Sequence, residues 1–365
     1  MILREIINFL EELAPLSLQE SYDNSGLIVG NCNQEVSKAI ICLDAIESVV
    51  DEAIEKGANL IIAHHPIVFS GLKKINGKNY VERVVIKAIQ NQIAIYAIHT
   101  NLDNVSLGVN RMMSDKIGLI NTQVLSPKAN LLNKLVVYAP EGNRLQLLNA
   151  LFEAGAGNIG NYSEASFTSN GEGSFKGNAD SNPTIGKANE RAYVNENRIE
   201  VLVESHSLTK VLAAMKANHL YEEVAYDLIA LKNSHQNIGS GMIGSLKEAM
   251  NVNDFFKHLQ EVFKVPVIRH TQINDQNISK VALCGGSGSF LLPTAISQKA
   301  DIFLSADFKY HEFFDADNQI VIADIGHYES EQYTSELLLR KLNKKFSNFA
   351  FFLTENNTNP LRYFI

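Results

Sequence analysis

The chain has 365 residues, of which 45% are hydrophobic and 20% are charged, and its formal net charge is −8. This composition is typical of a folded globular protein and excludes an intrinsically disordered chain. The length is too great for one ordinary core and predicts two or three domains. The acidic balance and the absence of a long basic run argue against nucleic acid as a main partner, because phosphate contacts need clustered Lys and Arg.

Several local features predict a cytoplasmic protein. The first twelve residues have helical spacing with charges such as Arg4 and Glu5 among the apolar positions, unlike the apolar core of a signal peptide. No run of about 18 apolar residues occurs, so no membrane span is expected. Cys32, Cys42 and Cys284 are too far apart for a Cys-x-x-Cys metal motif and indicate no disulfide framework.

The first third of the chain alternates strand and helix patterns. Strand patterns cover residues 39–43, 59–63 and 93–98, and helical patterns cover residues 47–55 and 80–90. Strands separated by helices of this length predict βαβ units and a parallel sheet. We therefore expect an N-terminal α/β lobe over residues 1–129.

The middle of the chain has a different pattern. Strands are predicted at 135–139, near 163–169, at 198–204 and at 221–231, helices at 144–154 and 208–218, and a loop rich in Gly, Asn and Ser at 170–190. The order β-α-β-β-α-β is that of the split βαβ or ferredoxin-like arrangement. Residues 130–234 are therefore expected to form an inserted α+β domain.

The end of the chain repeats the pattern of its beginning. Residues 37–59 align without gaps on residues 279–301, which places Cys42 on Cys284. Internal duplication predicts a C-terminal lobe over residues 235–365, so that two pseudo-symmetric α/β lobes with mainly parallel sheets face each other across a cleft. His65 would then correspond to Asp307. Because the identity is low, chance or convergence on the same strand-helix pattern is the alternative.

Three polar clusters follow apolar runs that we expect to be buried strands. The clusters are His64 with His65, His99 with Asp103, and His327 with Glu331. In parallel α/β sheets, sites form outside the carboxyl ends of the strands. Imidazole and carboxylate groups are ligands of zinc, iron and manganese. The sequence therefore predicts a divalent metal centre, with two ions per subunit as the preferred reading.

The spacing within the clusters suggests individual roles. His327 and Glu331 share one face if a helix begins there, whereas Glu329 would point elsewhere. His64 and His65 would point to opposite faces of a regular strand. Beyond the strand end, which Pro66 marks, the two imidazoles could serve two different ions. The alternative is that each cluster alone is an ordinary loop feature or solvated helix pair, and the occurrence of three together favours metal.

The roles of two further histidines are open. His99 is a candidate ligand, a group that orients a ligand, or a proton donor, and Asp103 is preferred to it as the ligand and as a bridging carboxylate. His311 follows another predicted strand, and a substrate role is weighed equally with a structural one. Both are therefore candidate catalytic residues. A glycine-rich turn at 285–288 either binds phosphate through backbone N–H groups or simply turns the chain tightly.

Taken together, the motifs resemble those of the Ngg-interacting-factor-three-like family, whose bacterial members are labelled GTP cyclohydrolase I type 2 homologues. The matching segments are Tyr22-Asp23-Asn24-Ser25-Gly26-Leu27 (the family more often has Trp first), Ala63-His64-His65-Pro66, His99-Thr100-Asn101-Leu102-Asp103, Gly285-Gly286-Ser287-Gly288, Gly326-His327-Tyr328-x-Ser330-Glu331 and Asn357-Thr358-Asn359-Pro360. The resemblance covers essentially the whole chain. It implies a dinuclear metal site at His64, His65, Asp103, His327 and Glu331. It also implies a toroidal homohexamer and a CutA-like or PII-like insert.

Two functions follow as hypotheses. The first is a metal-dependent hydrolase that acts on a nucleotide or related small molecule, with GTP ring opening as the named candidate and two Zn, Fe or Mn ions as cofactors. The second is a non-enzymatic metal-handling or regulatory hexameric ring in which the insert senses a ligand. The acidic chain argues against a DNA-binding role, which the family's name suggests.

Overall fold

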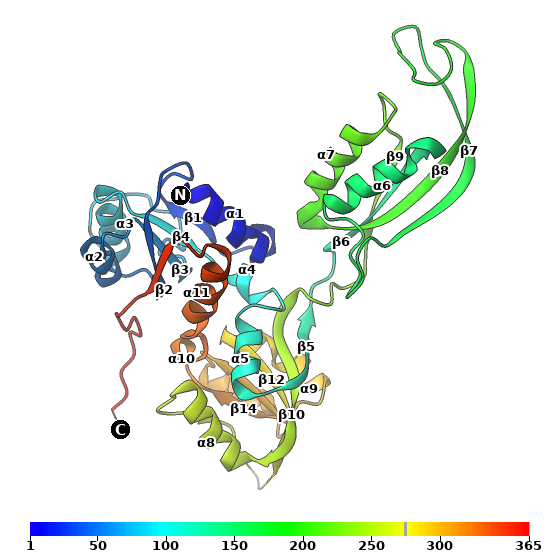
Figure 1. Cartoon of the computed structure of the whole chain (residues 1–365). Helices are drawn as coiled ribbons and strands as arrows, with labels where there is room; N and C mark the ends of the chain where they lie inside the picture. The colour runs from blue at the N-terminus through cyan, green and yellow to red at the C-terminus, as the bar shows by residue number, and fades with distance from the viewer. Residues whose placement is uncertain (274–275, 365) are drawn as a thin grey trace. The chain divides into compact units, whose positions relative to one another are not determined.

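The structure, a computed structural model, describes residues 1–273 and 276–364. Within these residues the chain forms two compact units (Figure 1). Unit 1 combines Met1–Ser126 with Asn237–Ile365, and unit 2 is Pro127–Gln236. Unit 2 therefore interrupts unit 1 in the sequence.

The first sheet of unit 1 has the strand order β1-β4-β3-β2-β15. Its strands are β1 (Gly26–Val29), β2 (Lys38–Asp44), β3 (Leu60–His65), β4 (Ala94–Ala97) and β15 (Ala350–Leu353). Strands β15, β2, β3 and β4 run parallel, and β1 is antiparallel to β4. The predicted apolar runs at 39–43 and 59–63 form interior strands, because a strand covered on both faces needs apolar residues throughout.

Helices cover both faces of this sheet (Figure 1). They are α2 (Glu47–Lys56) and α3 (Tyr80–Gln90) on one face, and α1 (Leu3–Leu13) and α11 (Thr334–Lys345) on the other. Local interactions set one end of each of two predicted helices. Asn79 caps α3 by accepting the backbone N–H of Glu82, and Gly57 ends α2 in the left-handed region with φ 64°.

The second sheet of unit 1 has the order β11-β14-β13-β12-β10-β5. Its strands are β5 (Ile120–Pro127), β10 (Gly239–Asn251), β11 (Arg269–His270), β12 (Asn277–Ser287), β13 (Ile302–Ala306) and β14 (Val321–Asp324). β12, β13 and β14 run parallel, whereas β10 and β11 are antiparallel to their neighbours β12 and β14. The helices α5 (Val109–Ile117), α8 (Val252–Phe263) and α9 (Leu292–Ser297) belong to this part of the unit.

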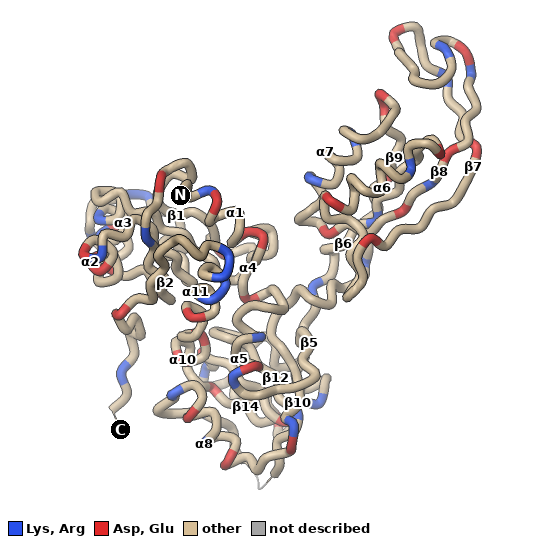
Figure 2. The backbone as a smooth tube through the Cα atoms, viewed as in Figure 1, with Lys and Arg blue, Asp and Glu red and all other residues tan. Residues whose placement is uncertain are grey.

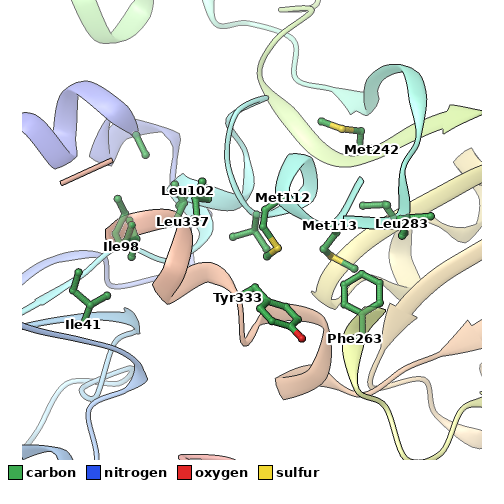
Figure 3. Packing of buried hydrophobic residues seen from close by; sticks show 14 of the residues in the cluster. Ile41, Ile98, Leu102, Met112, Met113, Met242, Phe263, Leu283, Tyr333 and Leu337 are labelled. Atoms are coloured by element: carbon green, nitrogen blue, oxygen red, sulfur yellow. The ribbon is translucent and has the colours of Figure 1, made fainter. Parts of the chain in front are cut away.

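The two sheets share one hydrophobic core. Ile41 of β2 and Leu283 of β12 belong to the same buried cluster, together with Met113 of α5, Phe263 of α8 and Leu337 of α11 (Figure 3). Burial of this many apolar side chains in one cluster holds the sheets together as one body. The ends of strands in the two sheets are thereby kept in a defined relation to each other.

Unit 2 has the element order β-α-β-β-α-β. Its elements are β6 (Leu132–Pro140), α6 (Arg144–Glu153), β7 (Ser166–Lys176), β8 (Arg191–Glu204), α7 (Leu208–Asn218) and β9 (Tyr226–Leu231). The sheet order is β7-β8-β6-β9, and every neighbouring pair is antiparallel. Leu151 of α6 and Met215 of α7 pack with Ile199 of β8 in a core separate from that of unit 1.

The prediction of a loop over 170–190 is wrong for its first part. β7 continues to Lys176, and Gly171 lies opposite Glu196 while Ser174 lies opposite Tyr193 of β8. Gly and Asn disfavour strands locally. The backbone hydrogen bonds offered by a long partner strand outweigh that preference, so the hairpin extends beyond the predicted strands.

Charged residues of both signs are spread along the chain (Figure 2). Basic residues gather on α11, where the last turn carries Lys344 and Lys345. No helix among the described residues combines the length and the apolar character needed to cross a membrane.

Candidate metal centre

Polar side chains from both sheets of unit 1 meet at the carboxyl ends of their parallel strands. β3 ends at His65, and Asp44, the last residue of β2, lies directly opposite it in register. α4 (Thr100–Asp103) starts directly after His99, beyond β4. In the second sheet, α10 (His327–Glu331) follows β14. The predicted clusters therefore converge as expected for ligands at strand ends.

The histidine pair lies within β3 rather than in the loop beyond it. Even so, the ring centroids of His64 and His65 are only 4.9 Å apart. His64 is fully buried, whereas His65 retains partial exposure. The strand ends at His65 because Pro66 cannot donate to the ladder.

A short helix begins at His327, which is the condition under which His327 and Glu331 were expected to share one face. His327 and Glu331 lie one turn apart, with Nε2 of His327 3.1 Å from Oε2 of Glu331. Glu329, as predicted, points elsewhere: its Oε1 accepts a hydrogen bond from the side chain of Asn359. Glu331 is almost fully buried, which makes its carboxylate costly unless cationic or hydrogen-bonding groups surround it.

The potential ligand atoms form three overlapping groups, each with all its atoms within 4.8 Å of one another. The groups are His64 with His65 and His99, His65 with His327 and Glu331, and His64 with Asp103 and Glu331. The structure thus brings together the five predicted ligands and also His99. Glu331 belongs to two groups: Oε2 lies 3.0 Å from Nε2 of His65, while Oε1 lies 3.9 Å from Nε2 of His64.

Each of the four clustered imidazoles is held through its Nδ1 atom. The Nδ1 partners are the Ile98 carbonyl for His64 at 2.8 Å, Asp44 for His65 at 2.8 Å, Asp23 for His99 at 2.7 Å and Asp307 for His327 at 2.6 Å. Metal-binding histidines characteristically donate their second ring N–H to a carboxylate or carbonyl in this way. The arrangement leaves Nε2 as the candidate ligand atom of each ring.

Among the described residues, two buried atoms in the cluster lack a hydrogen-bond partner. They are Nε2 of His64 and Oδ1 of Asp103, which lie 3.7 Å apart. Buried polar atoms are nearly always paired, and an unmade bond costs about 1–3 kcal/mol. An ion between these two atoms would satisfy both, so the residues present fit a divalent cation.

The electrostatics of the cluster also favour a cation. The charge of Glu331, with help from Asp307, raises the pKa of His327 to about 11. Burial alone would lower the pKa of His65, but hydrogen bonds to Asp44 and Glu331 raise it to about 9. Burial and the nearby Glu331 charge raise the pKa of Asp103 to about 7. Glu331 contributes to all three shifts, and a divalent ion would neutralise part of the buried negative charge.

The glycine-rich turn makes room for the cluster, and two of its backbone N–H groups have partners within the protein. The N–H of Gly286 donates to Oγ of Ser330 and that of Gly285 donates to Oδ1 of Asn110. These donors are therefore already used within the protein. Gly286 has φ +62°, and a Cβ there would collide with the Glu331 carboxylate.

The cluster lies in a cavity of about 1000 Å³. His65, His99, Asp103, His327 and Glu331 all line it. A cavity of this size matches the usual range for small-molecule sites. The candidate ligand cluster is therefore accessible to a small molecule.

The structure does not bring His311 to this cavity. His311 is exposed in the short helix η5 (Tyr310–Ala316), where its ring contacts Tyr310 and Phe314. The sequence places it after a strand, as it does the clustered residues. However, η5 turns its side chain to solvent, and the geometry gives no support to a catalytic role.

Sequence reasoning missed the role of Asp44 and left those of Asp23 and Asp307 unassigned. A signal existed for Asp44, because it follows the apolar run at 39–43 just as the predicted ligands follow theirs. Asp307 has a left-handed φ of 58°, which Asp tolerates, and this turn aims its carboxylate at His327. Thr358, near the C-terminus, donates to Oδ2 of Asp44 at 2.7 Å.

Comparisons with known proteins agree over most of the chain. A family model described as Duf34/NIF3 (NGG1p interacting factor 3) matches residues 1–360. A Halalkalibacterium halodurans protein named GTP cyclohydrolase 1 type 2 homolog is 41% identical over 324 residues, which cover 88% of this chain and 87% of that protein. A Bacillus subtilis protein of the same name is 36% identical over 366 residues, covering 99% and 98%.

A solved structure has the same fold. The crystal structure of a Bacillus cereus protein related to NIF3 matches with a TM-score of 0.86 and 36% sequence identity, covering 99% of each chain. The similarity therefore includes both units, and unit 2 is shared with this relative.

Proposed function

The chain belongs to the Duf34/NIF3 family, and on this basis and the site geometry we propose that it is a dinuclear metal-dependent hydrolase. Its substrate would be a nucleotide or a related small molecule. The observation that carries the proposal is the convergence of His64, His65, His327 and Glu331, together with Asp103, beside a cavity.

The overlap between ligand groups supports two ions rather than one. One ion would be held by His65, His327 and Glu331, and the other by His64, Asp103 and Glu331. The two carboxylate oxygens of Glu331 face different histidines, which suits a carboxylate that bridges two ions. Glu331 is thus favoured over Asp103 as the bridge.

Divalent ions at such a site would supply Lewis acidity and lower the pKa of water towards neutrality. The chain's own residues supply orientation. Asp44, Asp307 and the Ile98 carbonyl each hold a ligand imidazole with Nε2 directed into the cluster. Asp23 holds His99 in the same way, and a proton-transfer role for His99 stays a prediction.

The named candidate reaction is opening of the GTP ring, because curated relatives carry the name GTP cyclohydrolase 1 type 2 homolog. Metal-loaded protein should be assayed by chromatography on GTP, on other nucleotides and on phosphodiesters. We expect turnover that is lost in Glu331→Gln. Glu329→Gln is the matched control on the same short helix, because Glu329 points away from the cluster.

Two results would count against the hydrolase. One is the absence of turnover on every compound tested by protein with full metal content. The other is turnover that Glu331→Gln leaves unchanged. In the first case, the non-enzymatic metal-handling or regulatory ring becomes the better proposal.

We also propose that the two halves of unit 1 are related by a pseudo-twofold axis. The supporting observation is that β4-β3-β2 and β14-β13-β12 are both parallel triplets, bordered by an antiparallel β1 or β11. Unit 2 would be a CutA-like or PII-like ferredoxin-like domain, which is supported by its element order and antiparallel sheet. The assembly would be a homohexamer, which light scattering tests through the molar mass in solution.

A further inference from the structure

An aromatic surface borders the metal cluster inside the same cavity. Tyr22 and Phe69 both line the cavity, with their ring centroids 6.2 Å apart. Their exposed fractions are 63% and 49%, which is high for large aromatic side chains. Two adjacent exposed rings in a cavity are typical of a surface that binds an apolar or planar group.

The two rings are held in place by the backbone segments that carry them. The side chain of Asn24 donates to the carbonyl of Val68 at 2.6 Å, which ties the Tyr22 segment to the Phe69 loop. Asp23, next to Tyr22, accepts from Nδ1 of His99. The aromatic surface and the metal cluster are therefore positioned by the same short segment.

The rings also lie close to the candidate ligands. The ring centroid of Phe69 is 6.2 Å from that of His99, and His99 is 5.2 Å from His65. A planar ring lying on Tyr22 and Phe69 would thus have its edge beside the cluster. An electrophilic ring carbon, rather than a distant phosphorus, would then be next to the ions.

The charges in the cavity weigh against a polyphosphate. Among the described residues lining it there is no Lys or Arg, whereas Glu20, Asp44, Asp103 and Glu331 all line it. Phosphate groups are usually met by Arg, Lys or helix N-termini. Apart from the imidazoles that would hold the ions, only the proposed ions would offset phosphate charge in this cavity, and those ions are already faced by carboxylates.

We propose that the cavity recognises an uncharged planar heteroaromatic ring, such as the base of a nucleoside, by stacking on Tyr22 and Phe69. The proposal rests on the proposed metal site for the position of the reacting edge, but binding of the ring does not require turnover. Phosphate groups of a substrate would contribute little to affinity within this cavity.

Calorimetry on metal-loaded protein tests the proposal with six probes. Guanosine, adenosine and nicotinamide carry a ring without phosphate, GTP carries both, and ribose 5-phosphate and inorganic triphosphate carry phosphate without a planar ring. We expect at least one uncharged ring to bind, and both phosphates without a ring to bind more weakly. GTP should bind no more than a few-fold more tightly than guanosine.

Single substitutions separate stacking from structure. We expect Tyr22→Ala and Phe69→Ala to weaken ring binding by about ten-fold, the scale of one stacked base. Tyr22→Phe should retain the affinity of the wild type, since it keeps the aromatic side chain. Tyr310→Ala removes an exposed ring outside the cavity and should leave binding unchanged. Metal content by elemental analysis should be the same in all of these variants.

Three results would overturn the proposal. They are no binding of any uncharged ring, tighter binding of triphosphate than of every nucleoside, and ring binding that is insensitive to Tyr22 and Phe69. An altered oligomeric state of Tyr22→Ala with unchanged affinity would instead assign the rings to a subunit contact. Ring binding without any turnover would contradict the hydrolase but leave this inference standing.

Discussion

At the scale of single residues, the site depends on carboxylates that bind the histidine rings at Nδ1, away from the candidate ligand atom Nε2. Asp44, Asp23 and Asp307 each accept the Nδ1 proton of one imidazole. The hydrogen bond from His327 holds the pKa of Asp307 below its usual value, and the neighbouring groups together lower the pKa of Asp23. These carboxylates therefore stay ionised and fix the orientation of the rings.

Removing one of these charges should weaken metal binding without removing a ligand. We expect Asp44→Asn and Asp307→Asn each to lower metal affinity by about 10- to 100-fold, because the imidazole loses its orienting partner. Competition with a chromophoric chelator measures the change. Asp51→Asn is the control, since Asp51 is exposed and pairs with Lys87 on the surface. Equal effects of all three substitutions would contradict this role.

His327 and His311 provide a second comparison between chemically identical residues. His327→Ala should reduce the metal bound per subunit, because its Nε2 lies among the candidate ligand atoms. His311→Ala should leave the metal content unchanged, since His311 is exposed in η5. Elemental analysis after dialysis measures both. A loss of metal in His311→Ala would show that the site extends beyond the cluster described above.

At the scale of elements, the segment after β15 supports the site from outside. Thr358 donates to Asp44, which holds His65, and Asn359 donates to Glu329 in the helix that carries His327 and Glu331. Residues at the end of the chain therefore contact the carboxylate that holds His65 and the helix that carries His327 and Glu331.

A conservative substitution tests this support. Thr358→Val removes the hydroxyl with little change in shape and should weaken metal binding several-fold by freeing Asp44 to rotate. Thr358→Ser keeps the hydroxyl and should retain the affinity of the wild type. The chelator competition assay applies here too, and identical affinities of the two variants would rule out a role for the hydrogen bond.

The same segment supplies a pH-dependent contact at α2. Burial of Glu52 alone would raise its pKa, but hydrogen bonds from Lys56, Thr354, Asn356 and the backbone of Glu355 lower it to about 2. Since the folded pKa is depressed below the ordinary value of 4.5, the stabilisation is complete above that value and is lost as the pH falls towards 2. It amounts to at most about 3 kcal/mol.

We therefore expect Glu52→Gln to lower the free energy of unfolding at pH 7, and the difference from the wild type to shrink as the pH falls from 4.5 to 2. Urea titrations at pH 7, 4.5 and 3 measure this difference. Glu55→Gln, on the same helix, is the control. A difference that does not vary with pH would contradict the proposed charge contact.

At the scale of the whole molecule, the two units have separate hydrophobic cores. Leu304 belongs to the core shared by both sheets of unit 1, and Leu151 belongs to the core of unit 2. Both side chains are fully buried. The candidate ligand cluster lies entirely in unit 1, so its integrity depends on the first core.

Substitutions in the two cores should therefore have different consequences. Leu151→Ala should destabilise unit 2 by about 2–5 kcal/mol and leave the metal content unchanged. Leu304→Ala should destabilise unit 1 by a similar amount. It should lower the midpoint temperature of the unfolding transition that added metal shifts. Calorimetry with and without added metal separates the transitions. Loss of metal from Leu151→Ala would show that the units do not fold independently.

The sequence by itself determined where several interior parallel strands lie and which polar residues follow them. Interior parallel strands need unbroken apolar runs, and side chains that require water or a ligand can appear only where such a run ends. For this reason His64, His65, Asp103, His327 and Glu331 could be selected from local pattern. The shared face of His327 and Glu331, given a helix at that point, followed from their spacing of four residues.

Only the tertiary structure decided how those residues combine. The pairing of Asp44 with His65, the place of Glu331 in two ligand groups and the exposure of His311 depend on contacts between segments far apart in the chain. The extension of β7 to Lys176 likewise depends on its partner β8. Hydrogen bonds and ion pairs require both partners at defined distances, and those distances arise only when the shared core of unit 1 and the sheet of unit 2 are packed.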